Sequence, residues 1–291
     1  MKKALSLILI FLLLASLGGC ASQAPAPQVL ATTLPVYSFS QYLCQDTPLT
    51  VGQLIQDNVS CLHDYTLQVS QMKALEGAQV VVMNGGGLED FLSDALTVSH
   101  AIIDCSAGIA EHHHEQEQEE HHSHDHGQDA HFWLSPACGK QMAQNICSGL
   151  THLFPEHKDT FSRNLDALIR QLDDLQGYGE ATLADLSCRD LITFHDGFSY
   201  FAESFDLHII AAIEEEAGSE TSAAKLIELA ELVRANNLPA DFTEKNGSTA
   251  SAGIVATETG TKIFTLDMGI SQGDYFEIMY HNIDTVKEAL G

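Results

Sequence analysis

Basic residues are scarce in this sequence, which has 13 Lys and Arg against 40 Asp and Glu in 291 residues and a formal net charge of −27. Proteins that bind nucleic acid need clustered Lys and Arg to neutralise phosphates, so this composition argues against nucleic acid as a partner. The summed negative field favours a cationic ligand in general terms. Solubility alone accounts for the charge equally well.

The sequence also lacks a second apolar segment of about 20 residues, the length that spans a bilayer. The one long apolar run covers residues 4–17 and follows Lys2 and Lys3. A basic start followed by an apolar run too short for a comfortable span is typical of an export signal. We therefore predict a signal peptide at 1–19 and a soluble remainder.

The end of this signal carries a cysteine in a distinctive position. The order Leu17-Gly18-Gly19-Cys20 resembles the bacterial lipobox, in which the Cys thiol carries a lipid and becomes the first residue of the mature chain. An ordinary signal peptide with an incidental Cys20 is the alternative. Residues 20–28 are polar and rich in Pro and Ala, which suits a flexible tether between a lipid and a folded domain.

Six further cysteines leave the redox state open. An even number in an exported protein permits disulfides, but six cysteines allow fifteen connectivities and nothing in the sequence selects one. Free buried thiols are the other possibility. The six are Cys44, Cys61, Cys105, Cys138, Cys147 and Cys188.

Strand-like and helical segments alternate along most of the chain, which predicts α/β architecture. In residues 29–153 we expect strands at 29–36, 49–55, 78–83 and 101–104, and helices at 38–44, 70–75, 88–96 and 135–150. A long amphipathic pattern at 154–186 predicts a stiff linking helix. In residues 187–291 we expect strands at 190–194, 208–213 and 262–266, and helices at 197–205, 222–236 and 275–290. The fold class is therefore two α/β lobes with parallel-type sheets.

Residues 111–129 are of low complexity, with seven histidines among Glu, Gln and Asp. Nothing in this segment can build a core, so we predict a disordered loop within the first lobe. It acts either as an accessory collector of metal ions or as a solvated linker. Its histidines are His112, His113, His114, His121, His122, His124 and His126.

Four other residues have the right chemistry for a metal site and fall on four different loops that follow or border strands: His63, His131, His195 and Asp267. Open α/β sheets bind ligands at the carboxyl ends of their strands, so a cleft between two lobes would bring these side chains together. Three imidazoles and a carboxylate suit tetrahedral Zn2+, whereas Mg2+ and Ca2+ prefer oxygen ligands. Spacing alone does not establish the site, since a lone loop histidine is more often an ordinary surface residue.

The local sequences around the three histidines are more specific. They read CLHDY at 61–65, DAHFWLSP at 129–136 and FHDGFSYF at 194–201, with the His-rich segment just ahead of the second. Together and in this order they resemble the metal-binding lipoproteins of zinc and manganese ABC importers. The resemblance covers nearly the whole chain after the tether.

This resemblance implies two α/β lobes joined by one long rigid helix, with a metal ion in the cleft. It assigns His63, His131, His195 and Asp267 as ligands. In such proteins a His at the third position accompanies zinc and a carboxylate accompanies manganese, so His195 indicates Zn2+ as the transported ligand, with Mn2+ possible. The expected partners are an ABC permease and its ATPase. The expected state is a monomer, lipid-anchored on the extracytoplasmic side of the membrane.

Two departures from the family pattern affect the ligand set. Leu62 stands where the family usually has Pro, and Met268 follows Asp267 where Pro is usual. Without Asp267, water or a loop histidine would complete the site. A Cys61 thiolate is conceivable as a ligand, although a disulfide or a buried thiol fits that residue better. For the carboxylates that orient the histidines we predict Asp64, Asp196 and Glu258, with helix capping as the alternative for the two aspartates.

The sequence therefore predicts an extracytoplasmic binding protein that captures Zn2+ and delivers it to an ABC permease. Manganese import, a surface adhesin or metal buffer without transport, and a zinc hydrolase are the alternatives. Three histidines with an open fourth position would suit a hydrolase, but the sequence has no H-E-x-x-H motif.

Overall fold

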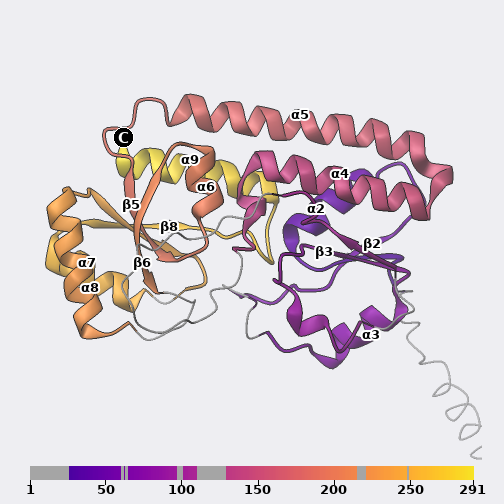
Figure 1. Ribbon diagram of the computed structural model, residues 1–291, viewed down its shortest axis with the longest axis horizontal. Coiled ribbons are helices and arrows are strands. Elements are labelled where there is room, and N and C mark those ends of the chain that lie inside the picture. Colours follow the sequence, from indigo (N-terminus) through magenta and orange to yellow (C-terminus); the bar gives the residue numbers. More distant parts are fainter. Residues whose placement is uncertain are drawn as a thin grey trace, which may run out of the picture.

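The computed structural model describes residues 26–59, 62, 65–96, 101–109, 129–214, 221–247 and 249–291. It has two α/β lobes side by side, with one long helix running along both (Figure 1). The predicted signal peptide, the lipidation site Cys20, the His-rich segment up to residue 128, and the residues Cys61, His63 and Asp64 lie outside the described residues. No helix within those described ranges is long and apolar enough to cross a membrane.

The first lobe is built on a four-stranded parallel sheet in the order β2-β1-β3-β4. Its strands are β1 (Val29–Ala31), β2 (Val51–Gln53), β3 (Val80–Met83) and β4 (Ala101–Asp104). The inner strands β1 and β3 are apolar and almost completely buried, as expected for a parallel sheet covered on both faces. The helices of this part are α2 (Leu34–Leu43), α3 (Val69–Gly77) and the short 3-10 helix η1 (Asp90–Leu92).

Two antiparallel helices follow the His-rich segment. After the 3-10 turn η2 (Phe132–Leu134), α4 (Pro136–Leu153) begins at Ser135, whose hydroxyl accepts a hydrogen bond from the backbone of Cys138. A second 3-10 turn, η3 (Pro155–His157), leads into α5 (Lys158–Thr182). The 25 residues of α5 extend about 37 Å, and the helix packs against α2 and α4 in the first lobe and α9 in the second.

A glycine lies near the C-terminal end of α5, where Phe205 packs against the helix. A Cβ atom at Gly179 would lie 2.1 Å from Cε1 of Phe205, so only glycine lets this ring reach the helix backbone. The helix ends at Thr182, a few residues before the predicted end at 186.

The second lobe holds two parallel strand pairs, with β5 lying beside β7. The strands are β5 (Asp190–His195), β6 (His208–Glu214), β7 (Ala240–Glu244) and β8 (Lys262–Leu266). The helices are α6 (Ser199–Ser204), α7 (Ala223–Asn236), α8 (Ala250–Thr259) and α9 (Tyr275–Leu290). The two-lobe α/β prediction is confirmed.

Four local predictions were wrong or incomplete. The strand predicted at 29–36 ends at Ala31, and its last three residues belong to α2, which begins at Leu34. The helix predicted at 88–96 is only the single turn η1. Strand β7 was not predicted, because Asp, Thr and Glu alternate with Ala and Phe in a segment that is nevertheless fully buried. Helix α8 was missed as well, since its Ser, Thr and Gly residues have weak helix propensity.

The described cysteines are free thiols. These are Cys44, Cys105, Cys138, Cys147 and Cys188. Burial raises the pKa of the Cys44 thiol to about 12, which makes it unreactive at neutral pH. Within the described part of the chain, the free-thiol alternative therefore holds.

The carboxylate of Glu89 is buried in the first lobe. Glu89 is 2% exposed and accepts hydrogen bonds from the Thr32 hydroxyl (2.5 Å) and from the backbone N–H groups of Asn84 (2.7 Å) and Gly85 (3.0 Å). These bonds favour the ionised form, but loss of water outweighs them and raises the pKa of Glu89 from 4.5 to about 7.

This shift predicts a pH dependence of stability. Between pH 4.5 and about 7 the folded protein keeps a proton on Glu89 that the unfolded chain has lost, so the free energy of unfolding falls as the pH rises through this window. A Glu89→Gln variant lacks this titration. We expect the unfolding free energy of the wild type, relative to the variant, to fall by roughly 3 kcal/mol across the window. Urea unfolding at a series of pH values measures it, and parallel profiles for the two proteins would contradict it.

Candidate metal centre

The first histidine of the centre, His131, begins the turn η2 and is 3% exposed. One carboxylate oxygen, Oδ1 of Asp129, holds both its ring and its backbone. The ring Nδ1 lies 2.8 Å from this oxygen, and the backbone N–H of His131 donates to it at 2.9 Å. A carboxylate at Nδ1 favours the tautomer with the proton there, which leaves the lone pair on Nε2. The His131 Nε2 atom is buried and has no hydrogen-bond partner among the described residues.

The second histidine, His195, is the last residue of β5 and is equally buried. Its Nδ1 is hydrogen-bonded to Oε1 of Glu244, the last residue of β7. Because β5 and β7 lie beside each other, the carboxyl ends of the two strands bring this pair together. Each lobe therefore contributes a buried histidine whose Nδ1 is held by a buried carboxylate.

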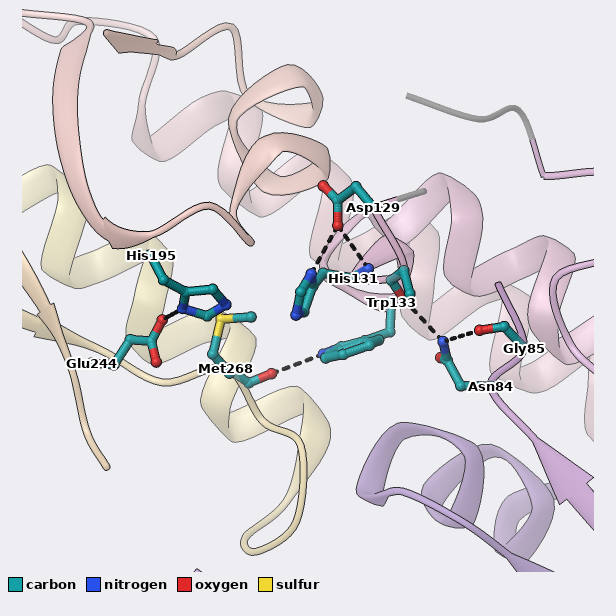
Figure 2. A network of polar contacts seen from close by, with 9 residues as sticks. Asn84, Gly85, Asp129, His131, Trp133, His195, Glu244 and Met268 are labelled. Carbon is teal, nitrogen blue, oxygen red and sulfur yellow. Dashed lines mark hydrogen bonds and ion pairs between the residues drawn. The ribbon is translucent and has the colours of Figure 1, made fainter. Parts of the chain in front are cut away.

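The two imidazoles meet between the lobes. Their ring centroids are 5.3 Å apart with an angle of 69° between the ring planes, and Figure 2 shows the two rings next to each other, with Glu244 bonded to His195 and Asp129 to His131. An imidazole whose Nδ1 is engaged by a carboxylate coordinates a metal ion through Nε2. This is the donor arrangement that a borderline metal ion such as Zn2+ requires.

Gly197 permits this arrangement on the second-lobe side. A Cβ atom at this position would lie 2.6 Å from Nε2 of His195 and 2.9 Å from Cε of Met268. Any larger residue would push the imidazole or the methionine out of place. The glycine of the H-D-G sequence is thus explained by close approach to the histidine.

The two lobes are joined beside the histidines by hydrogen bonds to the loop after β8. The Trp133 indole donates to the Met268 carbonyl (2.8 Å), and the Tyr275 hydroxyl donates to the Trp133 carbonyl (2.8 Å). The Leu34 backbone donates to the Ile270 carbonyl (2.9 Å). Trp133 also lies against the His131 ring, with centroids 5.2 Å apart (Figure 2). The hydrogen bonds between the lobes are therefore directly beside the two histidines.

The predicted fourth ligand, Asp267, follows β8 directly and lies in this loop. Its Oδ1 accepts a hydrogen bond from the Gly269 backbone (2.9 Å), and its Oδ2 is 2.8 Å from the Lys245 ammonium. Across the described ranges, no group of three His, Cys, Asp or Glu side chains is placed so that it could hold a metal ion. The structure therefore brings His131 and His195 together, whereas the Asp267 carboxylate is engaged with a lysine.

The first predicted ligand, His63, is outside the described residues, but the segment before it is placed. Asn58 and Val59 line one pocket together with residues of the second lobe, and the Asn246 side chain donates to the Val59 carbonyl (3.3 Å). The second-lobe residues of this pocket are Glu244, Lys245, Asn246, Asp267, Met268, Ile270, Ser271 and Gln272. Asn58 and Val59 thus lie on the same face as Glu244 and Asp267.

Asp129 and Glu244, which orient the two histidines, were not among the predicted carboxylates. Glu258 lies on the surface of α8 with its carboxylate 3.9 Å from the Arg234 guanidinium, so that prediction was wrong. Asp64 is outside the described residues, and its role and that of Asp196 stay predictions. Asp129, two residues before His131, was available from the motif, whereas Glu244 depended on recognising β7 as a strand.

Comparison with known proteins identifies the family. The family model described as zinc-uptake complex component A, periplasmic, matches residues 29–289. The chain belongs to the ZnuA family. The resemblance to zinc-type binding proteins of ABC importers is thereby confirmed.

Individual ZnuA-family relatives agree over nearly the full chain. The high-affinity zinc uptake system protein ZnuA of Bacillus subtilis is 28% identical, over 96% of this chain and 94% of its own length. The zinc-binding lipoprotein AdcA of Streptococcus pneumoniae is 27% identical over 99% of this chain, which spans 61% of AdcA. A crystal structure of ZnuA superimposes with a TM-score of 0.81 at 28% identity, covering 91% of this chain and 99% of that one.

The Glu244–His195 pair predicts a measurable effect on metal affinity. Glu244→Ala removes the acceptor that fixes the His195 ring and its tautomer, so we expect zinc affinity to fall by about 10- to 100-fold. Glu244→Gln keeps an acceptor oxygen and should recover part of this loss. Competition titration with a chromophoric chelator measures it. Glu258→Ala, which removes an exposed carboxylate from the same lobe, should bind zinc as the wild type does.

Proposed function

We propose that this ZnuA-family chain captures Zn2+ between its two lobes and delivers it to an ABC permease and its ATPase. The observation that carries the proposal is the pair of buried imidazoles, His131 and His195, which are each held at Nδ1 by a carboxylate and whose ring centroids are 5.3 Å apart. Membership of a zinc-uptake family supports the transport role over catalysis or adhesion. Imidazole donors favour Zn2+ over oxygen-preferring ions, and Mn2+ is the secondary candidate.

The proposed ligand set is His63, His131, His195 and Asp267. Asn58 and Val59, shortly before His63 in the chain, line the pocket beside Asp267, which supports His63 as the source of a third imidazole. Asp267 directly follows β8, and its carboxylate becomes available to a metal ion when the Lys245 ammonium leaves it. Three imidazoles and a carboxylate would then close a tetrahedral site.

We also propose that the chain is monomeric, extracytoplasmic and lipid-anchored through Cys20, with 20–28 as a tether. The proposed organisation keeps a first lobe at 29–153, a linking helix at 154–186 and a second lobe at 187–291. Within it, the His-rich segment 111–129 collects zinc for the cleft rather than forming the main site, because ordering such a segment around a metal costs conformational entropy.

The test is zinc binding by the chain from residue 21 onward, with and without 111–129. One tightly held Zn2+ per chain in both proteins supports a cleft site with an accessory loop. Zinc binding that disappears with the loop would overturn the proposal, because the cleft histidines would then not be a site. Measuring Mn2+ in the same competition assay tests the selectivity, and tighter binding of Mn2+ than of Zn2+ would contradict it.

A further inference from the structure

The carboxylate of Asp267, a proposed zinc ligand, forms an ion pair with Lys245. The Nζ atom of Lys245 is 2.8 Å from Oδ2 of Asp267. Lys245 directly follows Glu244, and its backbone N–H donates to the Leu266 carbonyl at 2.9 Å. Both partners are therefore fixed at the carboxyl ends of β7 and β8, next to the His195–Glu244 pair.

The two partners differ in freedom. The Asp267 side chain is 12% exposed, and its own backbone is tied to Asn282 by two hydrogen bonds, at 2.9 and 2.8 Å. The Lys245 side chain is 56% exposed. A long, half-exposed lysine chain can swing its ammonium into water at little cost, so the pair opens by movement of Lys245 while Asp267 stays.

We propose that Lys245 competes with Zn2+ for the Asp267 carboxylate and is released when the ion binds. The inference rests on the proposed function, since it takes Asp267 as a zinc ligand. In the exchange, the Nζ–H···Oδ2 hydrogen bond breaks and a bond from Oδ2 to Zn2+ forms. The ammonium keeps its proton and moves into solvent, so charge and atoms balance.

The competition lowers the affinity of the site for Zn2+ and assists release of the ion. Of the described residues that line the pocket beside the centre, Lys245 is the only one with a positive charge, against Glu244 and Asp267. Zinc must break the ion pair to gain its fourth ligand, and the ammonium is tethered nearby to reclaim the carboxylate when zinc leaves. Lys245 thus affects the affinity for Zn2+ and its dissociation rate without binding the ion.

The test is a Lys245→Met variant, which keeps the aliphatic stem and removes the charge. We expect it to bind Zn2+ about two- to fivefold more tightly, the range that follows from the strength of partly exposed ion pairs, with a slower dissociation rate. Lys262→Met is the matched control, because it removes the same charge from the exposed, opposite end of β8. Equal or weaker zinc binding by Lys245→Met, or an equal gain in Lys262→Met, would overturn the inference.

A double-mutant cycle distinguishes the inference from the function on which it rests. With Asp267→Asn in place, Lys245→Met should no longer tighten zinc binding, because there is no carboxylate to release. If Asp267→Asn binds zinc as the wild type does while His131→Ala does not, the inference fails and the cleft site stands. If none of these variants changes zinc binding, the proposed function itself fails.

A chemical readout follows the lysine directly. Acylation of Lys245 by an amine-reactive reagent, quantified by mass spectrometry on the full chain, should speed up when Zn2+ is added, because the ammonium leaves Asp267. Lys262 provides the internal reference in the same sample. No change in the ratio of Lys245 to Lys262 labelling on zinc addition would contradict release of the ion pair.

Discussion

His131→Ala should weaken zinc binding by more than about 100-fold while leaving the protein folded. The substitution removes a donor whose Nε2 is buried between the lobes and whose Nδ1 is held by Asp129. Loss of a carboxylate that merely orients a ligand costs about 10- to 100-fold, so loss of the ligand itself should exceed that range. Competition titration measures the affinity, and circular dichroism checks the fold.

His208→Ala is the matched control for this prediction. His208 also has its Nδ1 beside an aspartate, at 3.1 Å from Oδ1 of Asp190, but its side chain is 63% exposed and lies at the start of β6. An imidazole–carboxylate pair on the surface should contribute nothing to the tight site. Equal zinc affinity in the two variants would mean that His131 is not a ligand.

Trp133→Ala should cost the largest amount of stability of any single change considered, about 3–5 kcal/mol in the free energy of unfolding. Trp133 is completely buried next to the centre. It joins the lobes twice, since its indole donates to the Met268 carbonyl and its own carbonyl accepts from the Tyr275 hydroxyl. Truncation to alanine leaves a large cavity and removes the donor to the Met268 carbonyl. Denaturant unfolding measures the loss of stability.

Trp133→Phe separates the hydrogen bond from the bulk of the ring. We expect it to cost about 1–3 kcal/mol, because the Met268 carbonyl is left buried without its donor. It should also weaken zinc binding, since Met268 follows Asp267 in the chain. Phe161→Leu, in the buried face of α5, should lower stability without changing zinc affinity. A Trp133→Phe variant with unchanged zinc affinity would show that the hydrogen bond from Trp133 to Met268 does not position the metal site.

Sequence alone predicted the parts of the fold whose local patterns are strong. Helix α9 begins and ends where expected, because Asp274 caps it and its apolar face repeats at helical spacing. The apolar strand β3 was equally clear. Strand β7 was not, because its burial is imposed by neighbouring strands and not by an apolar sequence. The helix predicted at 88–96 was wrong, because only the single turn η1 forms there and the preceding loop is bonded to the buried Glu89.

The site shows the same division. His131 and His195 were found from their short motifs, and the structure places their rings against each other. Glu244 was missed because it lies 49 residues from His195 and depends on strand order. The contact of Lys245 with Asp267 joins the ends of two strands, so it is a product of tertiary structure that no local pattern encodes.

The most direct test of the central claim is a crystal structure of the chain without residues 111–129, grown with Zn2+ and collected at the zinc absorption edge. The account predicts one anomalous peak between the lobes, about 2.0–2.1 Å from Nε2 of His131 and Nε2 of His195, with His63 and Asp267 completing the coordination. A zinc ion bound elsewhere, with the space between His131 and His195 left without metal, would contradict it.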